Sequence, residues 1–232
     1  MLAFVSVLPK TTYIHMNDLH TYLEHTYLQP DITYAQVETL VQEAHEHAFA
    51  GLCLPPYWIK KARRDLPNDS LVQLVTVIGF PLGYQRTEAK LTEIELALKD
   101  GADEFDLVMN YSAFRANPHW VKVEFARCAK FVHEREKMLK VILETSRLSE
   151  RETLHAATLA QDAGVDFVKT STGFTERGAE LEAVRQLRST LADYVGIKAA
   201  GGIRTAAQAR AFIEAGADRI GTSRAVAMVR EE

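Results

Sequence analysis

The sequence predicts a (β/α)8 barrel, a TIM barrel of the α/β class, and three observations support this fold. Short β-branched runs alternate with longer amphipathic stretches, as in repeated βα units with a parallel sheet. A Gly-x-Asp turn recurs between a predicted helix and the next predicted strand, at residues 101–103, 164–166 and 216–218. The length of 232 residues suits a barrel folded as a single domain over residues 1–232.

Apolar, β-branched runs predict seven strands, at residues 51–54, 74–80, 104–110, 139–145, 166–172, 195–200 and 219–223. An eighth strand at residues 21–26 would close the barrel. Amphipathic stretches predict helices at residues 33–49, 57–66, 87–99, 119–135, 151–163, 180–191, 206–215 and 225–229. An open doubly wound sheet is the alternative, but the chain has neither the G-x-G-x-x-G nor the Walker sequence usual in such sheets.

Composition excludes several classes of protein. The net charge is -4 and the sequence pI is about 6.1, so the basic field of a nucleic-acid-binding protein is missing. Cys53 and Cys128 lie far apart and match neither a disulfide framework nor a metal knuckle, which favours a reduced, cytoplasmic protein. The histidines, His45 and His47 included, lack metal-ligand spacing, so we expect no metal. Residues 1–20 are expected to form an N-terminal arm or helix without a membrane role.

Three ionisable residues interrupt apolar strands. Asp106 lies within EFDLVMN, Lys169 within DFVKTST and Lys198 within VGIKAAGG. The catalytic groups of a barrel lie at the C-terminal ends of its strands, and the two lysines fall on consecutive strands about 4.8 Å apart. Burial beside a like charge can lower a lysine pKa and so produce an amine that forms a Schiff base, with Asp106 as the counter-charge and proton carrier. Each residue alone could instead be a strand-end lysine that reaches solvent or an aspartate that caps a helix.

Glycine-rich turns after the last two predicted strands suggest a phosphate site. Gly201 and Gly202 follow the Lys198 strand, and Ser223 and Arg224 precede the predicted helix at residues 225–229. Backbone N–H groups at such turns bind anions, and barrels often hold phosphate there. Alternatively, these glycines only permit tight turns.

The chain resembles the deoxyribose-phosphate aldolase family from about residue 22 to residue 229. The blocks that carry the resemblance are TVIGFPLG (76–83), ADEFDLVMN (102–110), LKVILET (139–145), GVDFVKTSTGF (164–174), KAAGGIRT (198–205) and EAGADRIGTS (214–223). The resemblance implies a class I aldolase without metal or cofactor. Such an enzyme reversibly cleaves 2-deoxy-D-ribose 5-phosphate to D-glyceraldehyde 3-phosphate and acetaldehyde.

Carried over by position, the resemblance implies that Lys169 forms the Schiff base, Lys198 perturbs it and Asp106 relays protons. The positions that it implies around the substrate or its phosphate are Thr26, Cys53, Phe80, Thr172, Gly173, Gly201, Gly202, Ser223 and Arg224. The expected partner is a small sugar phosphate rather than a nucleic acid or a membrane, and a homodimer is possible because many relatives are dimers.

The chain departs from the family pattern at several positions. Glu24-His25-Thr26 replaces Asp-x-Thr, and Pro55 replaces an Asn or aromatic residue. Thr175-Glu176-Arg177-Gly178 replaces a glycine-rich loop, and we expect no tyrosine-bearing C-terminal tail of the kind that some relatives have. Glu176 would oppose a phosphate, whereas Arg177 and Arg224 would favour one. Another Schiff-base aldolase or lyase of sugar phosphates is therefore an alternative, and a non-catalytic barrel that binds a phosphorylated metabolite is a more distant one.

Overall fold

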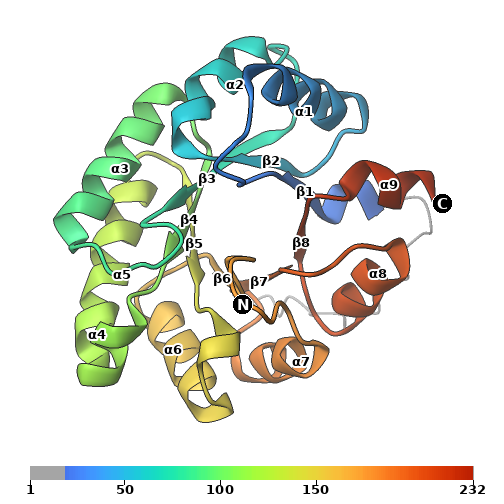
Figure 1. Ribbon diagram of the computed structural model, residues 1–232. Coiled ribbons are helices and arrows are strands. Elements are labelled where there is room, and N and C mark those ends of the chain that lie inside the picture. Colours follow the sequence, from blue (N-terminus) through green and yellow to red (C-terminus); the bar gives the residue numbers. More distant parts are fainter. Residues whose placement is uncertain (1–18, 232) are drawn as a thin grey trace, which may run out of the picture.

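The computed structural model describes residues 19–231, which form a closed barrel of eight parallel strands in chain order, with β1 paired to β8 (Figure 1). The strands are β1 Leu23–Thr26, β2 Gly51–Leu54, β3 Gln73–Ile78, β4 Glu104–Val108, β5 Met138–Ile142, β6 Phe167–Lys169, β7 Gly196–Ala200 and β8 Arg219–Thr222. The predicted fold and all eight predicted strands are confirmed. The predicted arm at residues 1–20 lies outside the described residues except for Leu19 and His20.

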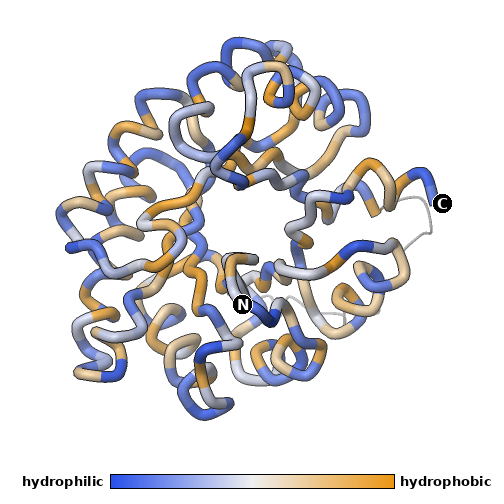
Figure 2. The backbone as a smooth tube through the Cα atoms, viewed as in Figure 1, coloured by the Kyte–Doolittle hydropathy of each residue, from blue (hydrophilic) through white to orange (hydrophobic). Residues whose placement is uncertain are grey.

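Helices surround the barrel and turn their apolar sides toward it (Figure 2). The α-helices are α1 Tyr34–Glu46, α2 Ile59–Asp65, α3 Thr87–Asp100, α4 Tyr111–Ala116, α5 Pro118–His133, α6 Glu150–Asp162, α7 Leu181–Thr190, α8 Ala206–Glu214 and α9 Ala225–Arg230. Short 3-10 helices lie at η1 Leu19–Tyr22, η2 Pro56–Trp58 and η3 Thr145–Arg147. The helix predicted at residues 57–66 is split between η2 and α2, and α4 was not predicted. No helix of the described residues is long and apolar enough to cross a membrane.

The recurring Gly-x-Asp turn ties each new strand to the preceding one. The glycines at 101, 164 and 216 have φ angles of 99°, 80° and 107°, which non-glycine residues rarely adopt. The aspartate Oδ2 atoms then accept backbone N–H groups of the preceding strand, from Leu74 to Asp103 at 3.0 Å, from Leu139 to Asp166 at 2.8 Å and from Ile197 to Asp218 at 2.9 Å. The turn therefore fixes where β4, β6 and β8 enter the barrel.

The strand register determines which side chains meet inside the barrel. Asp106 of β4 is the partner of Lys140 of β5, and Lys169 of β6 is the partner of Lys198 of β7. Glu24 of β1 lies between two glycines in register, Gly51 of β2 and Gly221 of β8. Since side chains alternate between the two faces of a strand, these charged groups share the interior of the barrel.

Candidate active site

Six ionisable side chains form a cluster inside the barrel. They are Glu24 of β1, Glu104 and Asp106 of β4, Lys140 of β5, Lys169 of β6 and Lys198 of β7. Each exposes 4% of its surface or less. Three carboxylates therefore face three ammonium groups, and the cluster is neutral in formal charge. Buried charges are tolerated only when they are paired in this way.

The three predicted catalytic residues meet at one carboxylate oxygen. Asp106 Oδ2 lies 2.8 Å from Lys169 Nζ and 2.7 Å from Lys198 Nζ. The two lysines are neighbours in the register of β6 and β7, so their side chains extend side by side and Asp106 separates their charged ends. The carboxylate thus offsets the repulsion that the sequence predicts between the two ammonium groups.

Lys140 lies on the other side of the same carboxylate and was missed by the sequence analysis. Its Nζ is 3.3 Å from Asp106 Oδ1 and 3.6 Å from Glu24 Oε1, and it donates a hydrogen bond to Glu104. Lys198 in turn donates a hydrogen bond to Glu24. Every lysine of the cluster therefore contacts a carboxylate, and Asp106 contacts all three lysines.

The electrostatics of the cluster keep its carboxylates ionised. Burial alone would raise the pKa of Asp106, but Lys169, Lys198 and Lys140 hold that pKa well below its ordinary value of 3.8. Burial would likewise lower the pKa of Lys198, but the nearby carboxylates of Asp106 and Glu24 raise it above its ordinary value of 10.5. Lys198 is therefore a fixed positive charge beside Lys169.

The interior wall at β2 and β3, beside this cluster, is apolar. Its buried members are Cys53, Val75 and Val77, and Leu28 and Phe80 pack against them. The ring of Phe80 meets the ring of Phe174 edge-on, with centroids 5.0 Å apart, so the loop after β3 touches the loop after β6. Burial raises the pKa of Cys53 to about 11, so this wall presents a neutral thiol.

Both threonines predicted to bind substrate use their hydroxyls within the protein. Thr26 Oγ1 donates to the backbone oxygen of Glu24 at 2.9 Å. Thr172 donates its hydroxyl, and its N–H at 3.2 Å, to the buried carboxylate of Glu144. Gly173 has a φ angle of 83°, and a Cβ there would meet nothing within 4 Å, so the backbone conformation rather than space requires glycine.

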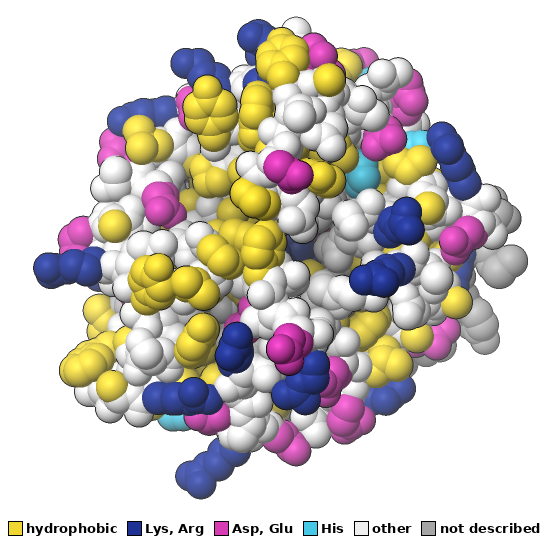
Figure 3. Space-filling model, viewed as in Figure 1, with side chains coloured by type: hydrophobic (Ala, Val, Ile, Leu, Met, Phe, Trp, Pro, Cys, Tyr) yellow, Lys and Arg dark blue, Asp and Glu magenta, His cyan; other side chains and the backbone are white. Residues whose placement is uncertain are grey.

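The predicted phosphate loops border the mouth of the barrel. Gly201 and Gly202 follow β7 with φ angles of 96° and 79°, and the exposed Ser223 and Arg224 follow β8. Figure 3 shows a hollow at the centre of this face, with hydrophobic side chains on its β3–β4 side and basic side chains toward α8 and α9. Arg204, which the sequence analysis did not single out, is exposed in the loop between β7 and α8.

The residues that replace the glycine-rich loop form a loop held by its neighbours. Arg177 Nη2 donates to the backbone oxygen of Ser146 at 3.1 Å, and its Nη1 lies 3.7 Å from a carboxylate oxygen of Glu180. A Cβ at Gly178 would lie 2.1 Å from the backbone oxygen of Gly201, so the one glycine retained here permits contact with the β7 loop. Arg177 is thereby engaged by the loop after β5 rather than by the β7 and β8 loops.

Comparison with known proteins identifies the family. Residues 13–228 match the model described as "DeoC/LacD family aldolase". This chain belongs to the DeoC/LacD aldolase family. It is 45% identical, over 91% of its length and 95% of the relative, to a protein of Thermococcus gammatolerans named "Deoxyribose-phosphate aldolase". A solved structure titled "QR15, an Aldolase" superposes with a TM-score of 0.88 at 38% identity, over 93% of this chain and 96% of that one.

A second solved structure of the family is titled "Unique tetrameric structure of deoxyribose phosphate aldolase from Aeropyrum pernix". It superposes with a TM-score of 0.86 at 35% identity, over 93% of this chain and 91% of that one. The predicted family, and with it a lyase of the aldolase type, is therefore confirmed. Among the residues that the structure describes, no group of His, Cys, Asp and Glu side chains is arranged to hold a metal ion.

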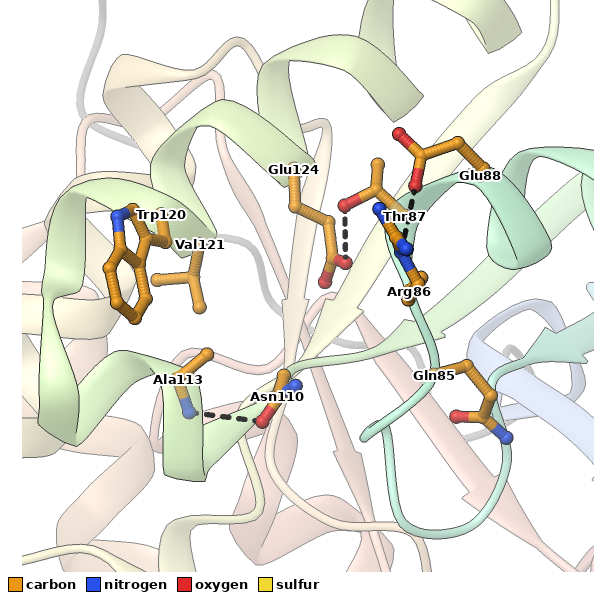
Figure 4. A pocket seen from close by; sticks show the side chains of 9 residues that line it. All are labelled: Gln85, Arg86, Thr87, Glu88, Asn110, Ala113, Trp120, Val121 and Glu124. Carbon is orange, nitrogen blue, oxygen red and sulfur yellow. Dashed lines mark hydrogen bonds and ion pairs between the residues drawn. The ribbon is translucent and has the colours of Figure 1, made fainter.

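A cavity of about 430 Å³ lies outside the barrel of this family member, between the start of α3 and helices α4 and α5. Figure 4 shows Trp120 on one side of it and Gln85 on the other, with Asn110 at its base. Glu124 in its wall is already bonded to Lys90 and Thr87. None of the charged side chains of the barrel interior lines it, so it is separate from the candidate active site.

Proposed function

We propose that the chain reversibly cleaves 2-deoxy-D-ribose 5-phosphate to D-glyceraldehyde 3-phosphate and acetaldehyde, with Lys169 as the amine that forms the Schiff base. The observation that carries the proposal is the contact of Lys169 and Lys198 with one oxygen of Asp106 inside an aldolase-family barrel. The names of relatives 41–45% identical to this chain support the choice of substrate.

In the first step, the neutral amine of Lys169 attacks the aldehyde carbon, and the carbonyl oxygen leaves as water to give an iminium ion. The amine must first lose a proton, and Asp106 Oδ2 at 2.8 Å is an acceptor within hydrogen-bond distance. Once formed, the iminium carries the same charge as the ammonium that it replaces. The neutral balance of three cations and three carboxylates is then restored, so the cluster is organised in advance for this intermediate.

In the second step, the bond between C2 and C3 breaks as the C3 hydroxyl loses its proton. The electron pair of the bond moves into the iminium and gives an enamine, and D-glyceraldehyde 3-phosphate leaves. Protonation of the enamine at C2 and hydrolysis then release acetaldehyde and the free amine. Asp106 with water would carry these protons, while Lys198 keeps a positive charge beside the reacting nitrogen.

The phosphate would bind where the loops after β7 and β8 expose backbone N–H groups and basic side chains. Gly201, Gly202 and Ser223 supply the backbone, and Arg224 supplies the charge. Glu176 lies in the neighbouring loop after β6, whose Gly178 packs against Gly201 and whose Arg177 bonds to the backbone of Ser146.

Reduction of the Schiff base tests the assignment. Borohydride added with deoxyribose 5-phosphate or acetaldehyde should add mass to the peptide that contains Lys169. Lys90 is a matched control within the same molecule, since it is equally buried but bonds to Glu124 and Val108 outside the site. An adduct on Lys198 instead, or no adduct at all, would refute the assignment.

A coupled assay of deoxyribose 5-phosphate cleavage, run beside 2-deoxyribose, separates the substrate from its alternatives. We expect Lys169→Ala to abolish cleavage and the phosphorylated sugar to be preferred. If the chain turned over another sugar phosphate and formed an adduct at Lys169 with it, a different aldolase activity of this family would be favoured. Turnover no faster than the uncatalysed reaction, in the wild type as in Lys169→Ala, would indicate a binding protein.

A further inference from the structure

Three consecutive hydroxyl residues, Thr170, Ser171 and Thr172, follow Lys169, and the protein itself uses two of them. Thr170 Oγ1 donates to the backbone oxygen of Ala200 at 3.0 Å and accepts its N–H at 3.1 Å. Thr172 Oγ1 donates to Glu144 and accepts the N–H of Phe174 at 3.1 Å. Both threonine hydroxyls therefore hold the β6 exit to neighbouring segments.

Ser171 differs from both threonines. It is fully buried, and among the described residues its Oγ is the one buried hydroxyl oxygen that has no hydrogen-bond partner. Buried polar groups are nearly always bonded, because an unsatisfied group loses its hydration without compensation. A hydroxyl without a partner in the protein, between two that are fully bonded, is free to bond to a group from outside the protein.

The position of Ser171 indicates which part of a substrate it could meet. Ser171 lies two residues past Lys169, where the chain leaves β6 for the mouth of the barrel, about 6.6 Å further along an extended chain. The backbone pairing continues past β6, since Thr145 N donates to the backbone oxygen of Thr170 at 2.8 Å. A Cβ at Gly201 would lie 3.4 Å from Ser171 Cβ, so Ser171 also borders the β7 loop proposed for phosphate.

We propose that Ser171 is a specificity-determining residue whose hydroxyl bonds the hydroxyl of the substrate carbon next to the C3 reaction centre. This inference rests on the proposed function. With C1 bonded to Lys169 and the phosphate at the β7 and β8 loops, the middle of the substrate would lie between them, next to the β7 loop that Ser171 borders at Gly201. The hydroxyl of that middle segment beyond the C3 reaction centre is the C4 hydroxyl, which in the condensation direction is the α-hydroxyl of the acceptor aldehyde.

Two acceptors with the same number of heavy atoms test the proposal in the condensation direction. Glycolaldehyde carries an α-hydroxyl where propanal carries a methyl group, and acetaldehyde serves as the donor for both. We expect Ser171→Ala to lower kcat/KM for glycolaldehyde about tenfold, the effect of one lost hydrogen bond, and to leave the value for propanal within about twofold. Its melting temperature should not fall, because the wild-type hydroxyl has no partner in the protein.

Thr170→Val is the matched control, since it removes a neighbouring hydroxyl that bonds to the backbone of Ala200. It should lower the melting temperature and leave the ratio of glycolaldehyde to propanal turnover unchanged. An equal loss for both acceptors in Ser171→Ala, an unchanged ratio, or a lower melting temperature would overturn the proposal.

Trapping with acetaldehyde and borohydride distinguishes the failure of this inference from that of the proposed function. Acetaldehyde has no hydroxyl, so the adduct at Lys169 should form equally in the wild type and in Ser171→Ala. An intact adduct with an unchanged acceptor ratio would overturn the role of Ser171 alone. The absence of any adduct at Lys169 in the wild type would overturn the proposed function, and this inference with it.

Discussion

The charge balance of the barrel interior predicts that Lys140 and Glu104 are strongly coupled in stability. Lys140→Met replaces the lysine by an uncharged side chain of similar volume. Three buried carboxylates then face only two ammonium groups. At an effective dielectric constant of about 20, one pair of unit charges 3.3 Å apart, the separation of Lys140 Nζ from Asp106 Oδ1, is worth about 5 kcal/mol. The lysine regains its hydration on unfolding, so we expect a net loss of about 3–5 kcal/mol in the free energy of unfolding.

Glu104→Gln alone should also destabilise the protein, since it leaves three ammonium groups with two carboxylates. The double variant restores neutrality, and its loss should be smaller than the sum of the single losses by about 2 kcal/mol or more. Equilibrium urea unfolding, followed by circular dichroism and fluorescence together, measures each value. Lys90→Met is the matched control, because this buried lysine pairs with Glu124 and should add independently to Glu104→Gln. Additive losses for Lys140→Met and Glu104→Gln would refute the charge-balance reasoning.

Three further predictions concern the pH dependence of stability, the reactivity of the thiols and the steric effect of a side chain at Gly221. The pKa values of Asp106 and Glu24 lie below their ordinary 3.8 and 4.5, so the unfolded chain binds more protons in that range. The stabilisation from these two carboxylates should be complete above about pH 4.5, and it should be lost as the pH falls through their pKa values in the folded state. In a plot of the urea midpoint of unfolding against pH, Asp106→Asn should therefore reduce the fall at acid pH. Burial raises the pKa of Cys53 to about 11 and that of Cys128 to about 12. A thiol reagent at pH 8 should therefore modify neither cysteine in the native protein and both cysteines in denaturant. Rapid modification of the native protein would contradict this prediction. A Cβ at Gly221 would lie 3.1 Å from Lys198 Cε, so Gly221→Ala should lower kcat at least tenfold, whereas Gly164→Ala, which meets nothing within 4 Å, should reduce only stability.

The fold could be predicted from the sequence because its strands and turns carry local signals. Apolar runs and Gly-x-Asp turns located the strands to within about two residues at their starts. The ends were less accurate, since the run at residues 166–172 contains only the three-residue β6. The chain there leaves the sheet for the mouth of the barrel, while Thr170, Ser171 and Thr172 stay buried, so no change from buried to exposed residues marks the end of the strand. Helix α4 was missed because it has six residues, and Asn110, which caps it, was assigned to the preceding strand.

The candidate site was predicted in part, by asking which ionisable residues interrupt apolar strands. That question found Asp106, Lys169 and Lys198, and the same question applied to LKVILET would have found Lys140. The contacts of Glu144 could not be predicted in this way. Its φ angle of 57° and its bonds to Thr172 and Thr175 depend on loop conformations and on segments about 30 residues apart. Local sequence does not encode such distances.

The glycines of the barrel interior explain how this chain accommodates the long side chain of Glu24. Long inward side chains lie beside glycines in register: Phe167 beside Gly196, and Glu24 between Gly51 and Gly221. A Cβ at Gly196 would lie 2.3 Å from the ring of Phe167, and one at Gly51 would lie 3.3 Å from Glu24 Cγ. Because adjacent strands share a fixed interior volume, a missing side chain on one strand provides room for a longer one on the next. The length of the Glu24 side chain is therefore compatible with a carboxylate that bonds to Lys198, and the charge balance of the cluster is kept.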